Sequence, residues 1–349
     1  MVLVASLGRA GSGQSGPTSL TLEECITIAL ENNHDIRAAR LSTQSALSDS
    51  RGSLSSILPT LNDSAGYSNQ ATYFSPQFGV PIPGREYYSA GLYLTQNIFD
   101  GGKWWNQISE GRNRYEYAFH AQLQTKVAVV LRVKRTFYQY LRDVQLVEVA
   151  AQAVRLAEQQ VTLVRRQYEV EAVARSDLLK QQVRLGELSV DLMNQKTAMK
   201  NSFNELANAM GLSVDSGFSV VDSPEVDGET PVDVDAVKKE VREHHPGLVA
   251  KRTEMVGSEL RVKLAKADYF PSLSASVSYD GSSDVLDQLY SDPETNWGRR
   301  IRLSLSLPIF SGLTRTTQVS RAEIDRKVVA EEYERLVKDV EVQLDLTVR

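Results

Sequence analysis

The sequence has little of what redox, metal-binding or nucleic-acid-binding proteins need. Among its 349 residues there is one cysteine, Cys25, which excludes an internal disulfide and a cysteine-rich metal site. The formal net charge is −5, which argues against a nucleic-acid partner, because such binding needs a basic surface. No nucleophile stands with a plausible base, so no enzyme activity and no cofactor are expected. The histidines lack partners at metal-ligand spacing, and we expect ordinary surface positions for His34, His120, His244 and His245.

Long apolar runs are also missing. No stretch of eighteen apolar residues occurs, which excludes a membrane-spanning helix. Hydrophobic residues make up 42% of the chain and charged residues 24%, a balance typical of an ordered protein. We therefore expect a folded chain, with residues 1–19 as a flexible leader or the remnant of a signal peptide.

The chain contains an internal repeat. Three segments recur in the same order at a near-constant separation. They are Asn32–Arg40 with His244–Arg252, Leu58–Leu61 with Phe270–Leu273, and Ile98–Gly101 with Ile309–Gly312. The sequence therefore predicts a duplication, with a first copy at 20–212, a linker at 213–232 and a second, incomplete copy at 233–349.

Each copy has the same predicted elements. A helix opens the copy and stops before a proline, at Pro59 and at Pro271, because the residue before a proline leaves the helical region. Two strands follow, at 60–75 and 87–99 in the first copy and at 271–280 and 299–310 in the second. A long helical hairpin then occupies 102–211, and only the start of its counterpart is present in the second copy.

The strands alternate between apolar and polar residues. A period of two gives a strand one apolar and one polar face, and here the polar residues are mostly serine rather than charged. The alternation alone leaves two alternatives open for the apolar face, which meets lipid or packs on helices in a soluble protein. The apolar positions are Tyr88, Ala90, Leu92, Leu94, Leu273, Ala275, Val277, Tyr279, Ile301, Leu303, Leu305 and Leu307.

The hairpin contains an unusually long helix. Between residues 103 and 170 only Gly111 interrupts the helix-forming sequence, which at 1.5 Å per residue spans on the order of 100 Å. Spacings of three, four and seven predict a packing seam. Its members are Val127, Val130, Phe137, Leu141 and Val144. A helix of this length indicates a coiled coil or a long hairpin.

Taken in order, these elements resemble the TolC-type outer-membrane efflux proteins over Leu20–Arg349. Four segments carry the resemblance. They are the opening helix Leu22–Asn33, the strand-to-helix junction Leu94–Gly102 with its counterpart Leu307–Gly312, the hairpin tip Gln167–Leu179, and the end of the returning helix Leu206–Gly211. Each motif is moderately specific, and their order along the chain is highly specific.

The resemblance implies a fold that is mainly α with a small β part. Tandem long helical hairpins form a periplasmic α-barrel, and four strands per protomer contribute to a trimeric 12-stranded transmembrane β-barrel. It also implies a passive exit duct of a tripartite efflux pump or type I secretion system, located in the cell outer membrane of a Gram-negative-type bacterium and extending into the periplasm. The implied partners are two further copies, a periplasmic adaptor (membrane fusion protein), an inner-membrane transporter and outer-membrane lipid.

The resemblance places adaptor docking at the hairpin tip. The tip residues are Glu171, Ala172, Val173, Ala174, Arg175, Ser176, Asp177, Leu178 and Leu179. The small side chains let an adaptor helix approach closely, while Arg175 and Asp177 fix its register. Glu171 stands where the family usually has glycine. The second tip falls beyond Arg349, so we expect the chain to be a fragment; the alternative function is a soluble or periplasmic coiled-coil scaffold that binds partners through its hairpin.

Overall fold

A computed structural model describes residues 18–75, 77, 79–213, 217–221 and 234–348. Most of the expected leader and linker, at 1–17, 214–216 and 222–232, lies outside these residues. The described chain forms two compact units. Unit 1 combines residues up to Leu41 with 122–232, and unit 2 combines 42–121 with 233–349, so each unit takes segments from both predicted copies.

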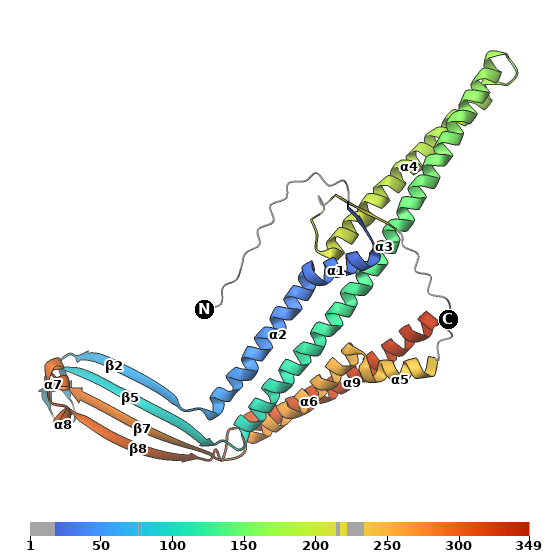
Figure 1. The fold of residues 1–349 in the computed structure, drawn as a ribbon. Helices are drawn as coiled ribbons and strands as arrows, with labels where there is room; N and C mark the ends of the chain where they lie inside the picture. Colours follow the sequence, from blue (N-terminus) through green and yellow to red (C-terminus); the bar gives the residue numbers. More distant parts are fainter. Residues whose placement is uncertain (1–17, 76, 78, 214–216, 222–233, 349) are drawn as a thin grey trace, which may run out of the picture. The chain divides into compact units, whose positions relative to one another are not determined.

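Unit 1 is built around a closed apolar core. It holds α1 (Leu22–Asn32), the start of α2 (His34–Gly52), most of α3 (Lys103–Glu169) and α4 (Arg175–Met210), the elements that Figure 1 shows in blue and green. Cys25, Phe137, Leu206 and Met210 are at most 1% exposed in this core. The core fixes where α1, α3 and α4 meet.

A small parallel sheet lies beside this core. β1 (Thr18–Leu20) pairs with β6 (Phe218–Val220), and Leu20, Phe218 and Val220 pack on the core. Thr18 and Ser19 therefore belong to a strand, and the prediction of a flexible leader through residue 19 is wrong for these two. Three-residue strands give too short an alternation to be read from sequence.

The opening helix of unit 1 is capped as its sequence predicts, but it breaks at Asn33. Thr21 and Glu24 form the capping box, with the Thr21 amide donating to Glu24 Oε2 at 2.8 Å. At the break, Asn33 Nδ2 donates to the Ala209 carbonyl at 2.8 Å, and Asn33 Oδ1 accepts from the Asp35 amide at 2.8 Å. One asparagine thus starts α2 and ties it to the end of α4.

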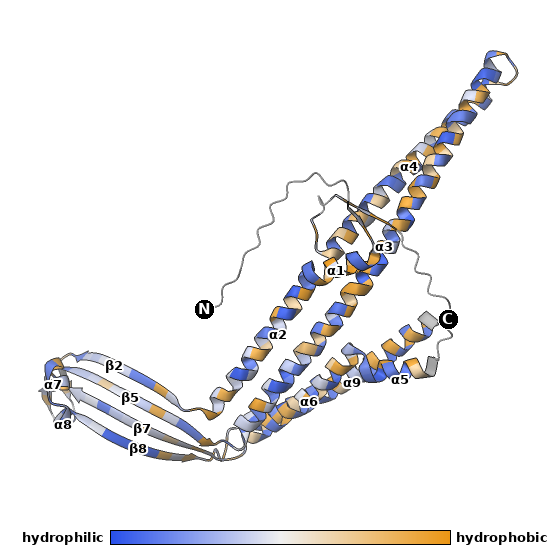
Figure 2. Cartoon of the chain, viewed as in Figure 1, coloured by the Kyte–Doolittle hydropathy of each residue, from blue (hydrophilic) through white to orange (hydrophobic). Residues whose placement is uncertain are grey.

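The predicted seam on α3 is only partly correct. Phe137 is buried, but Val127 is 40% exposed and Val144 is 38% exposed. The buried stripe instead includes Val129 and Val133. Apolar residues lie on several faces of α3, so spacing alone selected the wrong stripe for packing within one chain. None of the described helices is long and apolar enough to cross a membrane, and Figure 2 shows polar residues along all of α3 and α4.

Unit 2 contains a four-stranded antiparallel sheet. Its order is β2 (Thr60–Gln70), β5 (Arg85–Phe99), β7 (Ser272–Ser283) and β8 (Trp297–Ser306). Figure 1 shows strands from distant parts of the sequence side by side, blue and teal next to orange. β2 and β8 are the edges, and the two predicted copies meet between β5 and β7.

Several strand bounds differ from the prediction. The expected strand at 60–75 ends at Gln70, and Tyr73–Ser75 form a separate strand, β3, which pairs with β4 (Val80–Ile82). β8 ends at Ser306 rather than at residue 310, because Pro308 has no amide hydrogen to donate to a ladder. The loop between β7 and β8 contains two short helices, α7 (Leu286–Ser291) and α8 (Pro293–Asn296).

The remaining helices of unit 2 are α5 (Val234–His244), α6 (Pro246–Ala267) and α9 (Thr314–Val348). α6 and α9 run side by side (Figure 1) and are joined by ion pairs such as Lys266 to Glu323 at 3.0 Å. His245 separates α5 from α6 in an extended conformation that Pro246 imposes. The 3-10 helix η1 (Ser53–Ile57) closes α2, and Leu58 before Pro59 is extended as predicted.

Glycine makes the junction between sheet and helix. Gly101 and Gly102 adopt φ of 71° and 82° between β5 and α3, and a Cβ on Gly101 would lie 2.7 Å from the Ala267 carbonyl oxygen. Asp100 Oδ2 accepts from the Trp104 amide at 3.0 Å and so caps α3. The Asp-Gly-Gly motif therefore turns a strand directly into a long helix.

Candidate functional site: a two-faced sheet and a hairpin tip

The sheet has one apolar face. Residues directly opposite each other on antiparallel strands point to the same face. The register pairs Leu92 with Tyr279 and Leu94 with Val277, and pairs Val277 in turn with Ile301. Alternation along each strand then places every predicted apolar position within β5, β7 and β8 on this one face.

Some residues depart from the apolar pattern of this face. Leu307 follows the end of β8 and is 56% exposed, so the sheet does not fix its direction. Asp63 of β2 lies opposite Leu92 and brings a charge to the apolar face, as does Glu86 opposite Asn69. The structure thus brings together the predicted strand residues, and their contact with lipid stays a proposal.

Aromatic residues gather at the end of the apolar face near α7 and α8. The Tyr67 and Tyr88 rings lie 5.0 Å apart, and those of Tyr279 and Trp297 lie 4.9 Å apart. The Trp297 indole covers Gly281, where a Cβ would lie 2.7 Å from the ring, and its Nε1 donates to the Leu289 carbonyl at 2.7 Å. Rings that are apolar on their faces and polar at one edge suit a membrane–water boundary.

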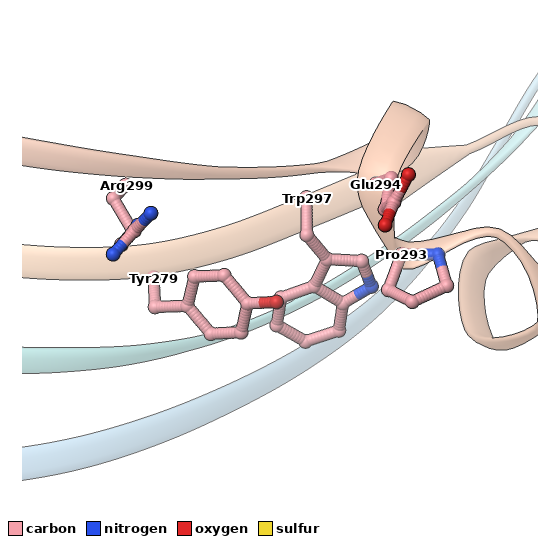
Figure 3. A pocket seen from close by; sticks show the side chains of 5 residues that line it. All are labelled: Tyr279, Pro293, Glu294, Trp297 and Arg299. Carbon is pink, nitrogen blue, oxygen red and sulfur yellow. The ribbon is translucent and has the colours of Figure 1, made fainter.

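A shallow hollow adjoins these rings. Figure 3 shows the Tyr279 ring of β7 and the Trp297 indole of β8 beside Pro293 and Glu294, with Arg299 farther along β8; the hollow has a volume of about 580 Å³. The Trp297 indole and the Tyr279 ring pack against each other on one side of it, with an angle of 33° between their planes. This packing joins the β7–β8 loop to the strands and fixes the end of the apolar face.

The opposite face of the sheet is polar. It carries serines of β7 together with Tyr93 and Thr95 of β5. The prediction that this face lacks charge is wrong, because the register also places ionisable side chains on it. These are Arg85, Asp280, Arg300 and Arg302. The alternation included Arg302 among the polar positions, whereas Arg85, Asp280 and Arg300 lie toward the strand ends, outside the residues over which it was read.

The hairpin tip is closed by a left-handed turn. Glu171 has a φ of 57°, a region that favours glycine. The Ala172 amide donates to the Gln167 carbonyl at 2.8 Å, and the Glu171 amide donates to the Tyr168 carbonyl at 3.0 Å. This pair of hydrogen bonds is a Schellman motif, so Glu171 takes the backbone conformation that glycine usually provides.

The predicted tip residues occupy two kinds of structure. Residues 171–174 form the turn, and Arg175–Leu179 form the first turns of α4. Ala172 and Ala174 are exposed, and Leu179 is 49% exposed. Asp177 lies in the first turn of α4 and pairs with Lys180 at 3.4 Å. The tip therefore presents small and apolar side chains within reach of a charged pair.

Cys25 and His245 are among the titratable groups whose pKa values are perturbed by burial. Burial raises the pKa of the Cys25 thiol to about 11. Desolvation lowers the pKa of His245, whose Nδ1 atom is buried without a hydrogen-bond partner among the described residues. His120 and His245 are half-buried, so the prediction of an ordinary surface position is wrong for these two, whereas His34 and His244 are exposed as predicted. Within the described ranges, no group of three His, Cys, Asp or Glu residues is placed to hold a metal ion.

Known proteins share this sequence pattern. Residues 25–212 match the model of the "Outer membrane efflux protein" family. "Outer membrane protein TolC" of Vibrio cholerae is 20% identical over 336 residues, which cover 95% of this chain and 75% of that protein. "Probable efflux pump outer membrane protein TtgC" of Pseudomonas putida is 19% identical over 320 residues, which cover 91% of this chain and 65% of that protein.

Solved structures share the fold. The Campylobacter jejuni CmeC outer membrane channel superposes with a TM-score of 0.80 at 18% identity, covering 91% of this chain and 68% of that one. The fold is therefore mainly α with a small β part, that of TolC-type channels. The family consists of outer-membrane channels and not of enzymes. This chain belongs to the outer membrane efflux protein family and is a protein of the outer membrane that extends into the periplasm.

Proposed function

We propose that three copies of this chain form the passive exit duct of a tripartite efflux pump or type I secretion system. One observation carries the proposal: the sheet of unit 2 has a mostly apolar face, a polar face and two unpaired edges. Such a sheet is unstable alone in water, because it exposes both apolar surface and unpaired backbone groups.

The strand directions support closure by copies of the same chain. All neighbouring strands are antiparallel, so the edge strands β2 and β8 also run in opposite directions. β8 of one copy therefore meets β2 of the next in an antiparallel pair, and a ring of copies closes with no free edge. Closure satisfies every backbone group within lipid, which is the requirement for a spanning sheet.

Barrel size favours three copies. Two copies of the four-stranded sheet give a barrel of eight strands, whose interior is filled by side chains. Three copies give twelve strands and leave an aqueous lumen lined by the serine-rich face. The apolar face then meets outer-membrane lipid, with the residues Tyr88, Ala90, Leu92, Leu94, Leu273, Ala275, Val277, Tyr279, Ile301, Leu303 and Leu305.

The exposed residues of the helical hairpin support the proposal that helices of several chains form the wall of the duct. Large apolar side chains remain exposed along α3 and α4, including Leu156, Leu163 and Val190, which are 50–65% exposed. Exposed apolar residues along a whole hairpin indicate surfaces that neighbouring helices cover. A helix of 67 residues extends about 100 Å, enough to form a long periplasmic duct.

The hairpin tip is the proposed docking site for a periplasmic adaptor, which in turn binds an inner-membrane transporter. Ala172 and Ala174 allow close approach of a partner helix, while Arg175 and Asp177 offer charges that fix its register. No cofactor and no catalysis are part of this proposal. The duct provides a path, and the energy for export comes from the transporter.

Single-cysteine labelling tests the orientation of the sheet. Cys25 is fully buried and its thiol pKa is raised to about 11, so we expect it not to react with thiol reagents at neutral pH. Leu303→Cys and Ser304→Cys are neighbours on β8 that point to opposite faces. We expect a lipophilic maleimide to label Leu303→Cys in lipid vesicles, and a charged, water-soluble maleimide to label Ser304→Cys.

Equal labelling of both positions by the water-soluble reagent would contradict the channel. It would favour the alternative function, a soluble coiled-coil scaffold, although the family relationship supports a channel. Chemical cross-linking of the same vesicles checks the copy number, with trimers as the expected product. The wild-type chain is the control and should take up neither reagent.

A further inference from the structure

We propose that Arg300 and Arg302 make the membrane section of this duct selective for anions, so that molecules with carboxylate, phosphate or sulfate groups pass preferentially. This inference rests on the proposed function, because it needs the polar face of the sheet to line the lumen. It goes further by naming a substrate class and the residues that select it.

The two arginines lie next to each other on one face of the sheet. They are alternate residues of β8 and therefore point to the same face. Arg300 lies opposite Ser278, and Arg302 lies opposite Ser276. Between them is a hollow of about 180 Å³, lined also by Tyr93 and Thr95 of β5.

The lining offers hydrogen-bond donors in addition to charge. Guanidinium groups present N–H donors in a planar fork that matches the oxygens of carboxylate and phosphate groups. The serine, threonine and tyrosine hydroxyls add O–H donors without adding negative charge. A hollow with two cationic forks and several hydroxyls suits an oxyanion.

Little negative charge balances these arginines. Among the described strand residues, Asp280 is the one carboxylate on the polar face. It accepts from the Ser278 hydroxyl at 2.7 Å and lies 3.7 Å from Arg300. No carboxylate of the described residues pairs with Arg302. Arg85 of β5 adds a further positive charge to the same face.

The other face has the opposite balance. Its charged strand residues are Asp63, Glu86 and Arg299, so negative charge exceeds positive there. The polar face therefore carries three arginines and one carboxylate, whereas the other face carries one arginine and two carboxylates. Three copies would place two rings of arginine at neighbouring levels of the lumen, and rings of Lys or Arg are the general device of anion-selective pores.

Reversal potentials in planar lipid bilayers test this inference. We expect the wild-type protein to conduct chloride better than potassium in a KCl gradient whose dilute side is about 0.1 M, where the screening length is about 10 Å. The double substitution R300S/R302S should lower the chloride-to-potassium permeability ratio several-fold. Inorganic phosphate should reduce chloride current in the wild type more than in the double variant.

Matched controls isolate the face and the sign of charge. Arg299→Ser removes the neighbouring arginine from the other face and should leave the permeability ratio unchanged. Asp280→Ser removes the carboxylate from the polar face and should raise the ratio. In about 1 M salt, where the screening length falls to about 3 Å, the difference between wild type and R300S/R302S should shrink.

Two results would overturn the proposal, and they are distinguishable. A cation-selective wild type, or a ratio that R300S/R302S leaves unchanged, would overturn the anion inference while leaving the duct in place. An absence of any conductance in bilayers that contain the protein would overturn the proposed function and this inference with it.

Discussion

The core of unit 1 and the sheet of unit 2 place apolar side chains in opposite surroundings. Phe137, Leu206 and Met210 are at most 1% exposed, whereas Ile301 and Leu303 are 81% and 66% exposed. Both regions consist of regular secondary structure. The difference shows that one region completes its hydrophobic core within a single chain, while the other exposes a surface that only other molecules can cover.

The largest expected effect comes from shortening one apolar side chain in each region to alanine. Phe137→Ala should lower the free energy of unfolding of unit 1 by about 3–5 kcal/mol, because it leaves a cavity in a closed core. Leu303→Ala should change the stability of the isolated chain by less than about 0.5 kcal/mol, because that side chain has few contacts to lose. Urea denaturation followed by circular dichroism measures both, and similar losses would contradict the comparison.

The next effect appears only in lipid. Leu303→Arg should cost about 2–4 kcal/mol of insertion free energy, the range for a cation on the lipid side of a barrel. Ser304→Arg, one residue away on the polar face, should insert almost normally. Flotation with lipid vesicles and protease protection give the inserted fraction. If both variants insert equally, the apolar face does not meet lipid.

A smaller effect belongs to the core and appears at alkaline pH. The folded state holds the Cys25 thiol neutral with a pKa of about 11, above its ordinary value of 9.0. Since the unfolded chain releases this proton first, the stability of unit 1 should fall as pH rises from about 9 to about 11. Cys25→Ala should remove that part of the dependence, and thermal unfolding at several pH values measures it. An unchanged pH profile in this variant would mean that the thiol does not contribute.

The smallest effect concerns the hairpin tip, which is outside both regions. Glu171→Gly should relieve the cost of a left-handed residue, about 1–2 kcal/mol, less the 0.5–1 kcal/mol that glycine loses in entropy. Hydrogen exchange at the Ala172 amide, which donates to Gln167, should therefore slow slightly. Glu171→Ala keeps a Cβ and should give no gain, so equal slowing in both variants would exclude backbone strain as the cause.

Alternation of residue type predicted the faces of the sheet, because a period of two follows directly from strand geometry. Strand order and the edges were not readable, because pairing between β5 and β7 joins residues far apart in the sequence. The helix breaks were missed for two reasons. Pro246 signals the break at His245 by the same rule that was applied at Pro59, whereas the break at Asn33 depends on contacts with α4.

The hairpin tip and the polar face of the sheet were also predicted only in part. The position of the hairpin tip followed from the family resemblance, but the left-handed Glu171 did not, because glutamate is an unusual choice for that conformation. The sequence contains the arginines of the polar face but does not show which residues of other strands share that face with them. Their shared direction with Asp280 emerges only from the register of β7 and β8.

The antiparallel edges of the sheet have a consequence for how pore width can vary. A ring built from whole copies of this chain gains or loses four strands at a time, and barrel diameter grows roughly in proportion to strand number. Pore width therefore changes in steps, with the number of copies in the ring. Point substitutions do not adjust it gradually. Substitutions on the inner surface instead change which solutes a duct of fixed calibre admits.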